Sequence, residues 1–120
     1  MMTVYRNFRF HSARYLPKLS NDHICKQMHG HTFNLTVYIK DKINNNTGFV
    51  IDFYDIDKIV KKSIIDLIDH KVLNDLEGLS NPTSEHLIIW IWNKLIQELP
   101  KLVKIKLSED HGTGIVYQGE

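Results

Sequence analysis

Residues 29–39 have the sequence His-Gly-His-Thr-Phe-Asn-Leu-Thr-Val-Tyr-Ile, and this stretch decides the fold. Every second residue from Phe33 to Ile39 is apolar, and the residues between them are mostly polar. Side chains alternate between the two faces of an extended chain, so the apolar residues share one face. The pattern therefore predicts a long strand with one face in the protein core.

The same alternation predicts three further strands, at residues 4–10, 103–107 and 115–117. A shorter apolar run at 49–51 follows the turn-forming residues 44–48, and it predicts one more short strand. Residues 15–28 show no periodicity and contain Pro17, so we expect a loop there.

Two other stretches have apolar residues at spacings of three and four, which predicts helices that each pack one stripe against a flat surface. Asp52 can cap the first helix. Its stripe consists of Ile56, Ile59, Val60, Ile64, Leu67 and Ile68. Asn81 or Thr83 can cap the second helix, and Pro82 suits its first turn. The stripe of this helix consists of Leu87, Ile88, Ile91, Leu95 and Leu99.

The main elements follow the order strand, strand, helix, helix, strand, strand. This order predicts an α+β fold in which two helices cover one face of an antiparallel four-stranded sheet. At 120 residues the chain is long enough for one core, and no repeat or linker divides it. We therefore expect a single domain over residues 1–120.

Charge and composition exclude several classes of partner. The chain has 15 Lys and Arg against 14 Asp and Glu, so it lacks the charge excess that predicts binding to nucleic acid or a membrane surface. Its one cysteine, Cys25, cannot form an intrachain disulfide and is typical of a reducing compartment. No apolar run resembles a signal peptide or reaches the length of a membrane span. We expect a cytoplasmic protein.

His29 and His31 stand two residues apart at the start of the predicted strand. Such residues share a face, so both imidazoles can point at one metal ion, and Gly30 between them leaves room for close approach. A catalytic zinc ion usually has three protein ligands, so this pair needs a third. Alternatively, the two histidines serve packing or capping.

Three further residues are candidates for acid–base chemistry. Cys25, in the predicted loop, can act as a base or nucleophile if a nearby cation lowers its pKa, or it can be an inert thiol or a third zinc ligand. Asp69 and His70 close the first predicted helix, where a carboxylate can fix the imidazole tautomer. Adjacent helix positions do not face each other, so this pair works together only if the chain turns out of the helix there. The alternative is that the pair is a surface feature.

Glu109 continues the odd-numbered apolar face of the strand at 103–107. A carboxylate in that position is costly unless a donor pairs with it. A ligand with two adjacent N–H groups would bind both of its oxygens. The alternative is exposure at the strand end.

Taken together, the motifs resemble those of the 6-pyruvoyltetrahydropterin synthase family, and more closely its 6-carboxytetrahydropterin synthase branch. The run Cys-x-x-x-His-Gly-His is the most specific of them. The matching segments are 8–10, 25–31, 48–53, 69–70, 73–74, 81–85, 90–92, 109 and 117–120. The resemblance implies the tunnelling fold, in which subunits close their sheets into barrels and stack as a dimer of trimers with active sites between subunits.

The resemblance also implies a role for each candidate residue. Cys25 is the general base, Asp69 orients His70, and His70 relays protons. Glu109 anchors the guanidine-like edge of the pterin, and Thr83 and its neighbours belong to the pterin pocket. A zinc ion, for which His29 and His31 are ligands, polarises hydroxyls of the substrate.

The implied reaction converts 7,8-dihydroneopterin triphosphate to 6-carboxy-5,6,7,8-tetrahydropterin, releases acetaldehyde and triphosphate, and belongs to queuosine (preQ0) biosynthesis. One alternative is 6-pyruvoyltetrahydropterin synthase activity on the same substrate. A second is a metal-poor paralogue that binds pterins without turnover. A third is a structural zinc module formed by Cys25, His29 and His31.

Arg14 departs from the family pattern, because it stands where the family has its first zinc-ligand histidine. Arginine is always charged and has no lone pair for a metal ion. Parity places Arg14 on the same face as Phe10, where the ligand should be. His11 replaces that ligand only if a bulge shifts the strand, and His23 could reach in from the loop. We therefore expect either a rebuilt site or weak or absent zinc.

Overall fold

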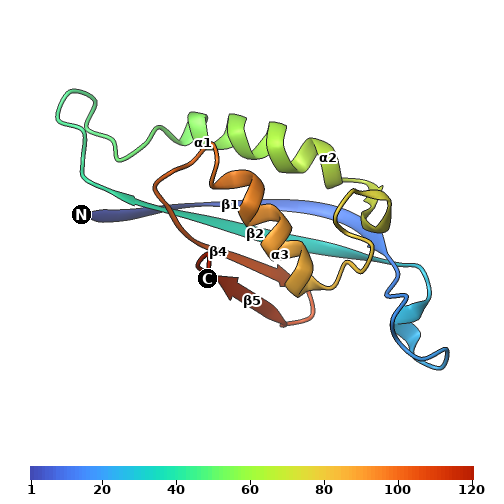
Figure 1. The fold of residues 1–120 in the computed structure, drawn as a ribbon. Coiled ribbons are helices and arrows are strands. Elements are labelled where there is room, and N and C mark those ends of the chain that lie inside the picture. Colours follow the sequence, from blue (N-terminus) through green and yellow to red (C-terminus); the bar gives the residue numbers. More distant parts are fainter.

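Two strands of 13 residues form the centre of the sheet in the computed structural model, which describes all of residues 1–120. Strand β1 (Met2–Arg14) pairs antiparallel with β2 (His29–Asp41) in an unbroken register, from Met2 opposite Asp41 to Arg14 opposite His29. Their length makes the molecule elongated, with extents of 57 × 23 × 22 Å (Figure 1).

Three shorter strands complete the sheet, in the order β3-β1-β2-β4-β5. Strands β4 (Leu102–Glu109) and β5 (Gly114–Tyr117) extend the antiparallel sheet beyond β2. The four strands of the predicted antiparallel sheet are therefore confirmed. Strand β3 (Lys71–Val72) pairs parallel with β1, and its two residues are too few for the sequence to show a period.

The predicted strand at residues 49–51 is wrong. The amide of Asn44 donates to the carbonyl of Phe49 over 2.7 Å, and the amide of Gly48 donates to the carbonyl of Asn44 over 2.7 Å. These bonds join residues of one loop to each other, and residues 49–51 pair with no strand of the sheet.

The helices begin at the predicted caps. Asp52 accepts a hydrogen bond from the amide of Tyr54 and caps α1 (Phe53–Val60), which continues through the π-helical turn η2 (Lys61–Ile65) into α2 (Asp66–Ile68). Of the two candidate caps for α3 (Ser84–Leu95), Thr83 is the one used, and Pro82 precedes the helix instead of lying in its first turn. Two short 3-10 turns complete the chain, η1 (Ile24–Lys26) and η3 (Leu73–Asp75).

The helices lie on one face of the sheet and enclose the core with it (Figure 1). Two apolar positions were predicted on the wrong side. Leu67 is 40% exposed because the wider π-helical turn before it shifts the helical phase. Val103 is 37% exposed because the β2–β4 register shifts at Ile39, which places Leu102 in the core instead. None of the helices has the length and apolar character that a bilayer span requires.

The end of α2 is fixed to β1 by hydrogen bonds, and these position two candidate catalytic residues. The buried hydroxyl of Ser12 donates to the carbonyl of Ile68 over 2.6 Å. The amide of His70 then donates to the carbonyl of His11 over 2.6 Å. His70 adopts a φ of 60°, so the chain turns sharply out of the helix at this point.

Ser12→Ala tests this connection. The substitution leaves the buried carbonyl of Ile68 without its hydroxyl donor, so we expect a loss of about 1–3 kcal/mol in the free energy of unfolding. Urea denaturation measures the loss, and Ser80→Ala, at an exposed position, is the matched control. Equal stability of the Ser12→Ala and control variants would contradict the role given to Ser12.

Candidate functional site

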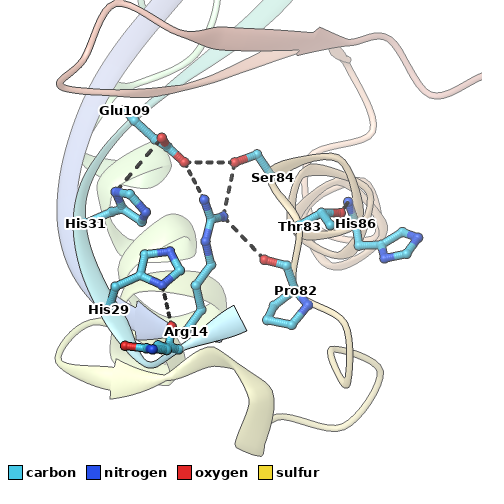
Figure 2. Close-up of polar contacts among 9 residues, drawn as sticks. Arg14, His29, His31, Pro82, Thr83, Ser84, His86 and Glu109 are labelled. Carbon is cyan, nitrogen blue, oxygen red and sulfur yellow. Dashed lines mark hydrogen bonds and ion pairs between the residues drawn. The ribbon is translucent and has the colours of Figure 1, made fainter. Parts of the chain in front are cut away.

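Arg14, His29 and His31 gather at one end of the sheet, on its helix-covered face. Arg14 lies directly opposite His29 in the β1–β2 pairing, and His31 lies opposite the buried Ser12. Directly opposed residues of antiparallel strands project from the same face. The position of Arg14 predicted from parity is therefore confirmed, and Figure 2 shows both imidazoles beside its side chain.

The guanidinium of Arg14 is held inside the protein and paired with Glu109. Arg14 is only 6% exposed, and its Nη2 donates to Oε1 of Glu109 over 2.5 Å. Its Nη1 donates to the carbonyl of Pro82 over 3.3 Å and to the hydroxyl of Ser84 over 3.1 Å. The ring of Phe33 lies 5.3 Å from the guanidinium carbon, within cation–π range. A buried charge needs such partners, so this network fixes Arg14 in place.

Both histidines have a buried ring nitrogen, Nε2, without a hydrogen-bond partner. Nδ1 of His29 lies 2.7 Å from the carbonyl of Gln27, so it must carry the proton and donate it, which leaves a lone pair on Nε2. The rings of His29 and His31 are 4.7 Å apart and nearly perpendicular. Nε2 of both rings and Nε of Arg14 are buried without a hydrogen-bond partner. The site thus concentrates unsatisfied polar atoms around the guanidinium.

Charges in this cluster depend strongly on burial. Burial lowers the pKa of His31, and the charge of Arg14 adds to that effect against the opposing pull of Glu109. Burial alone would raise the pKa of Glu109, but Arg14 and His31, with hydrogen bonds from Arg14 and Ser84, hold it below its ordinary value. Glu109 is therefore an ionised acceptor, and His31 is a neutral imidazole at pH 7.

These residues do not fit the three-ligand zinc site that the family resemblance implies. No group of three His, Cys, Asp or Glu side chains is placed to hold a metal ion. The unbroken β1–β2 register has no bulge, so His11 points to the opposite face beside Thr32. His23 caps η1 by accepting from the amide of Cys25. Of the histidines predicted as ligands, only His29 and His31 remain, and a fixed cation stands where the third ligand would be.

Glu109 lies at the wall of a cavity of about 210 Å³ between the start of α3 and the β4–β5 turn. The cavity is lined by Ser84, Glu85, Leu107, Glu109, Thr113, Gly114 and Ile115. Thr83, the predicted pocket residue, does not line it, because its hydroxyl accepts from the amide of His86 as the helix cap. The next residue, Ser84, donates to Oε1 of Glu109 over 3.2 Å instead.

Asp69 and His70 form the predicted pair, with Oδ2 of Asp69 3.0 Å from Nδ1 of His70. They lie beside His11, whose side chain points to the opposite face of the sheet from Arg14. The turn out of the helix at His70 brings them together, as adjacency in a helix could not. The backbone amide of His11 donates to Asp69 over 2.9 Å, and this bond, aided by His70, lowers the pKa of Asp69. The ring of His11 lies 5.7 Å from that of His70. His70 itself is 75% exposed, so it is available to a second molecule.

Cys25 lies apart from both clusters. It belongs to η1, in the loop that projects beyond the ends of β1 and β2 (Figure 1). No hydrogen bond joins its thiol to Asp69, His70 or the two histidines of β2 within the chain. The single chain therefore does not assemble the predicted catalytic set.

The sequence pointed to Ser84 only as a neighbour of Thr83 in the pterin pocket, and it did not point to His111. Ser84 stands within the recognised run at 81–85, but nothing in its type distinguishes it from Thr83. His111 follows Glu109 by two residues, and its ring lies 6.3 Å from that of His31. Its place in the β4–β5 turn gives it no periodicity, so only the folded turn reveals it.

Comparisons with known proteins agree with the fold. A family model described as 6-pyruvoyl tetrahydropterin synthase matches residues 3–120. The 6-carboxy-5,6,7,8-tetrahydropterin synthase of Synechocystis is 33% identical over 91% of this chain and 87% of its own. The 6-pyruvoyl tetrahydrobiopterin synthase of Dictyostelium discoideum is 34% identical over 80% of this chain and 74% of its own. The structure of Caenorhabditis elegans 6-pyruvoyl tetrahydropterin synthase superposes with a TM-score of 0.90, at 25% identity over 99% of this chain and 96% of that one.

The metal content of the purified protein tests the assignment of Arg14. Two imidazoles beside a guanidinium bind zinc weakly, so we expect well under one zinc per chain by atomic emission. Arg14→His supplies a third imidazole and should raise the content toward one, whereas Arg6→His, far from the site, should not. One tightly held zinc in the unmutated chain would contradict this description of the site.

The pH dependence of stability tests Asp69. Because its pKa is lowered in the folded protein, the ionised carboxylate stabilises the fold above its unfolded pKa of about 4. That contribution is lost as the pH falls through the lowered folded value. We expect the unfolding temperature to exceed that of Asp69→Asn at pH 6, and the difference to shrink below about pH 4. A difference that does not change with pH would contradict the assignment.

Proposed function

Because the match over residues 3–120 shows that the chain belongs to the 6-pyruvoyl tetrahydropterin synthase family, we propose that it binds a pterin and acts as a lyase of pterin metabolism. The finer proposal is that it converts 7,8-dihydroneopterin triphosphate to 6-carboxy-5,6,7,8-tetrahydropterin, with release of acetaldehyde and triphosphate, in queuosine biosynthesis. Similarity to the Synechocystis 6-carboxy-5,6,7,8-tetrahydropterin synthase over 91% of the chain supports this choice of reaction. Cys25 as a free thiol agrees with a cytoplasmic location.

The observation that carries the proposal is the ionised carboxylate of Glu109 at the wall of the 210 Å³ cavity. A pterin has an N–C–N edge with two adjacent N–H donors, which a carboxylate binds through both oxygens. In the proposed complex this edge pairs with Glu109. The ring then lies between the start of α3 and the β4–β5 turn, where the cavity is.

Proton transfer in the proposed reaction belongs to Cys25, Asp69 and His70. The thiolate of Cys25 removes a proton from a carbon of the substrate side chain, and the imidazole of His70 returns a proton to an oxygen. Asp69 holds Nδ1 of His70, which fixes the tautomer of the ring. The proposed mechanism has no zinc-dependent step, because the residues of the site do not form a three-ligand zinc site.

A second copy of the chain is part of the proposal. Cys25 and the Asp69–His70 pair do not meet within one chain, and both are accessible. We propose that they meet across an interface between copies, in a dimer of trimers as the family resemblance implies. Small-angle scattering or analytical ultracentrifugation measures the assembly, and a monomer with full activity would refute this part of the proposal.

A second candidate function is pterin binding without turnover, favoured by the lack of a three-ligand metal site beside Arg14. Incubation with 7,8-dihydroneopterin triphosphate, followed by chromatography of the products, distinguishes the possibilities. A 6-carboxy product supports the lyase, and a 6-pyruvoyl product supports the related synthase activity. Pterin binding with no product supports the second candidate.

Cys25→Ala tests the base. If the thiolate removes the proton, we expect turnover to fall by about 10²- to 10⁴-fold, with the thermal unfolding temperature and pterin affinity unchanged. Thr47→Ala, in the exposed loop before α1, is a control for handling and purity. Retained turnover would remove Cys25 from the mechanism, and unfolding of the variant would indicate a structural role instead.

A further inference from the structure

The guanidinium of Arg14 and the carboxylate of Glu109 are hydrogen-bonded to each other, so each occupies a group of the other that could bind a ligand. The guanidinium directs Nη2 at Oε1 of Glu109, and Ser84 donates to the same oxygen. Oε2 accepts no hydrogen bond, because its neighbour, Nδ1 of His31, is 3.9 Å away. One oxygen of the carboxylate is therefore saturated from inside the chain, and the other faces His31 without a hydrogen bond (Figure 2).

A guanidinium and the edge of a 2-amino-4-oxo-pyrimidine ring present the same chemistry. Each places two N–H donors on neighbouring nitrogens of one carbon, the arrangement that a carboxylate binds through both oxygens. A ligand of this class needs Oε1 as well as Oε2 of Glu109. It can bind in that way only if Arg14 gives up Oε1.

Displacement of Arg14 is costly. Its side chain is buried, its Nε has no partner, and Glu109 is the only anion within 4 Å of it. Separation from Glu109 would leave an uncompensated charge inside the protein. Arg14 therefore competes for Glu109, at high effective concentration, with any ligand that has an N–C–N donor edge.

We propose that Arg14 is a built-in competitor for Glu109, which lowers the affinity of the site for guanidine-type ligands and sets its specificity. The proposal rests on the proposed function only in the choice of a pterin as the natural ligand of this class. Removal of the guanidinium leaves Oε1 of Glu109 with Ser84 as its one donor, so both oxygens can accept from a ligand, and it leaves a space of matching shape. Free guanidinium ion should then bind there in place of the lost side chain.

The experiment compares the unmutated protein with Arg14→Ala. Guanidinium chloride, well below denaturing concentrations, is titrated by calorimetry against a sodium chloride control, and pterin is titrated by fluorescence. We expect saturable guanidinium binding to Arg14→Ala alone, and at least about tenfold tighter pterin binding than to the unmutated protein, equivalent to about 1.4 kcal/mol. Arg6→Ala, which breaks the exposed pair with Asp57, is the control and should gain neither.

Two further variants keep the result interpretable. If Arg14→Ala unfolds, Arg14→Met keeps the length and apolar contact of the side chain without its charge, and the same gains are expected. Glu109→Gln in the Arg14→Ala background should abolish both gains, because the carboxylate is gone.

The outcomes separate this proposal from the proposed function. Guanidinium binding to Arg14→Ala without pterin binding supports the competitor role and refutes pterin as the ligand. Tight pterin binding by the unmutated protein that does not improve in Arg14→Ala or Arg14→Met overturns the competitor role and leaves the proposed function standing. Gains that persist in the double variant also overturn it, since Glu109 would not be the shared site.

Discussion

The antiparallel pairing of β1 with β2 is the constraint on which the rest of the structure depends. A shift of one residue would move every side chain of β1 to the other face of the sheet. The observed register places Ser12 and Arg14 beneath the helices, opposite His31 and His29, and it leaves His11 outside. Since the helices cover only one face, this pairing decides which residues are buried and which meet solvent or another molecule. It divides the candidate residues into two groups with different physical properties.

The two groups suit different tasks. The inner group is desolvated, so its electrostatic interactions are strong, and burial lowers the pKa of His31. The outer group, Asp69 with His70, is accessible, and its geometry comes from the backbone amide of His11. An arrangement of this kind can bind a rigid ring on one side and exchange protons on the other. It needs a further element to connect the two, and the projecting loop with Cys25 is suited to reach a neighbouring molecule.

The sequence predicts the elements well, because alternation and helical spacing are local properties. The strand face from Phe33 to Ile39 and the caps at Asp52 and Thr83 required no knowledge of distant residues. Two predictions of which face a residue occupies failed at irregularities that changed the phase: the β2–β4 shift turned Val103 outward, and the π-helical turn turned Leu67 outward. The predicted strand at 49–51 failed because that segment closes a loop on its own backbone. Within the site, parity placed Arg14 correctly, but its bonds to Ser84 and Glu109 span 70 and 95 positions. Such contacts depend on how helix and sheet pack, which no local pattern encodes.

The buried charge of Arg14 links the stability of the fold to the chemistry of the site. A guanidinium in this position must be neutralised, and Glu109 is the only carboxylate that can do it. A divalent ion held by His29 and His31 would place a second cation beside the first, with the same single carboxylate to offset both. The metal ion and Arg14 are therefore alternatives, and this chain contains Arg14. The same reasoning applies to ligands, because whatever binds Glu109 must either replace the guanidinium or leave its pair intact.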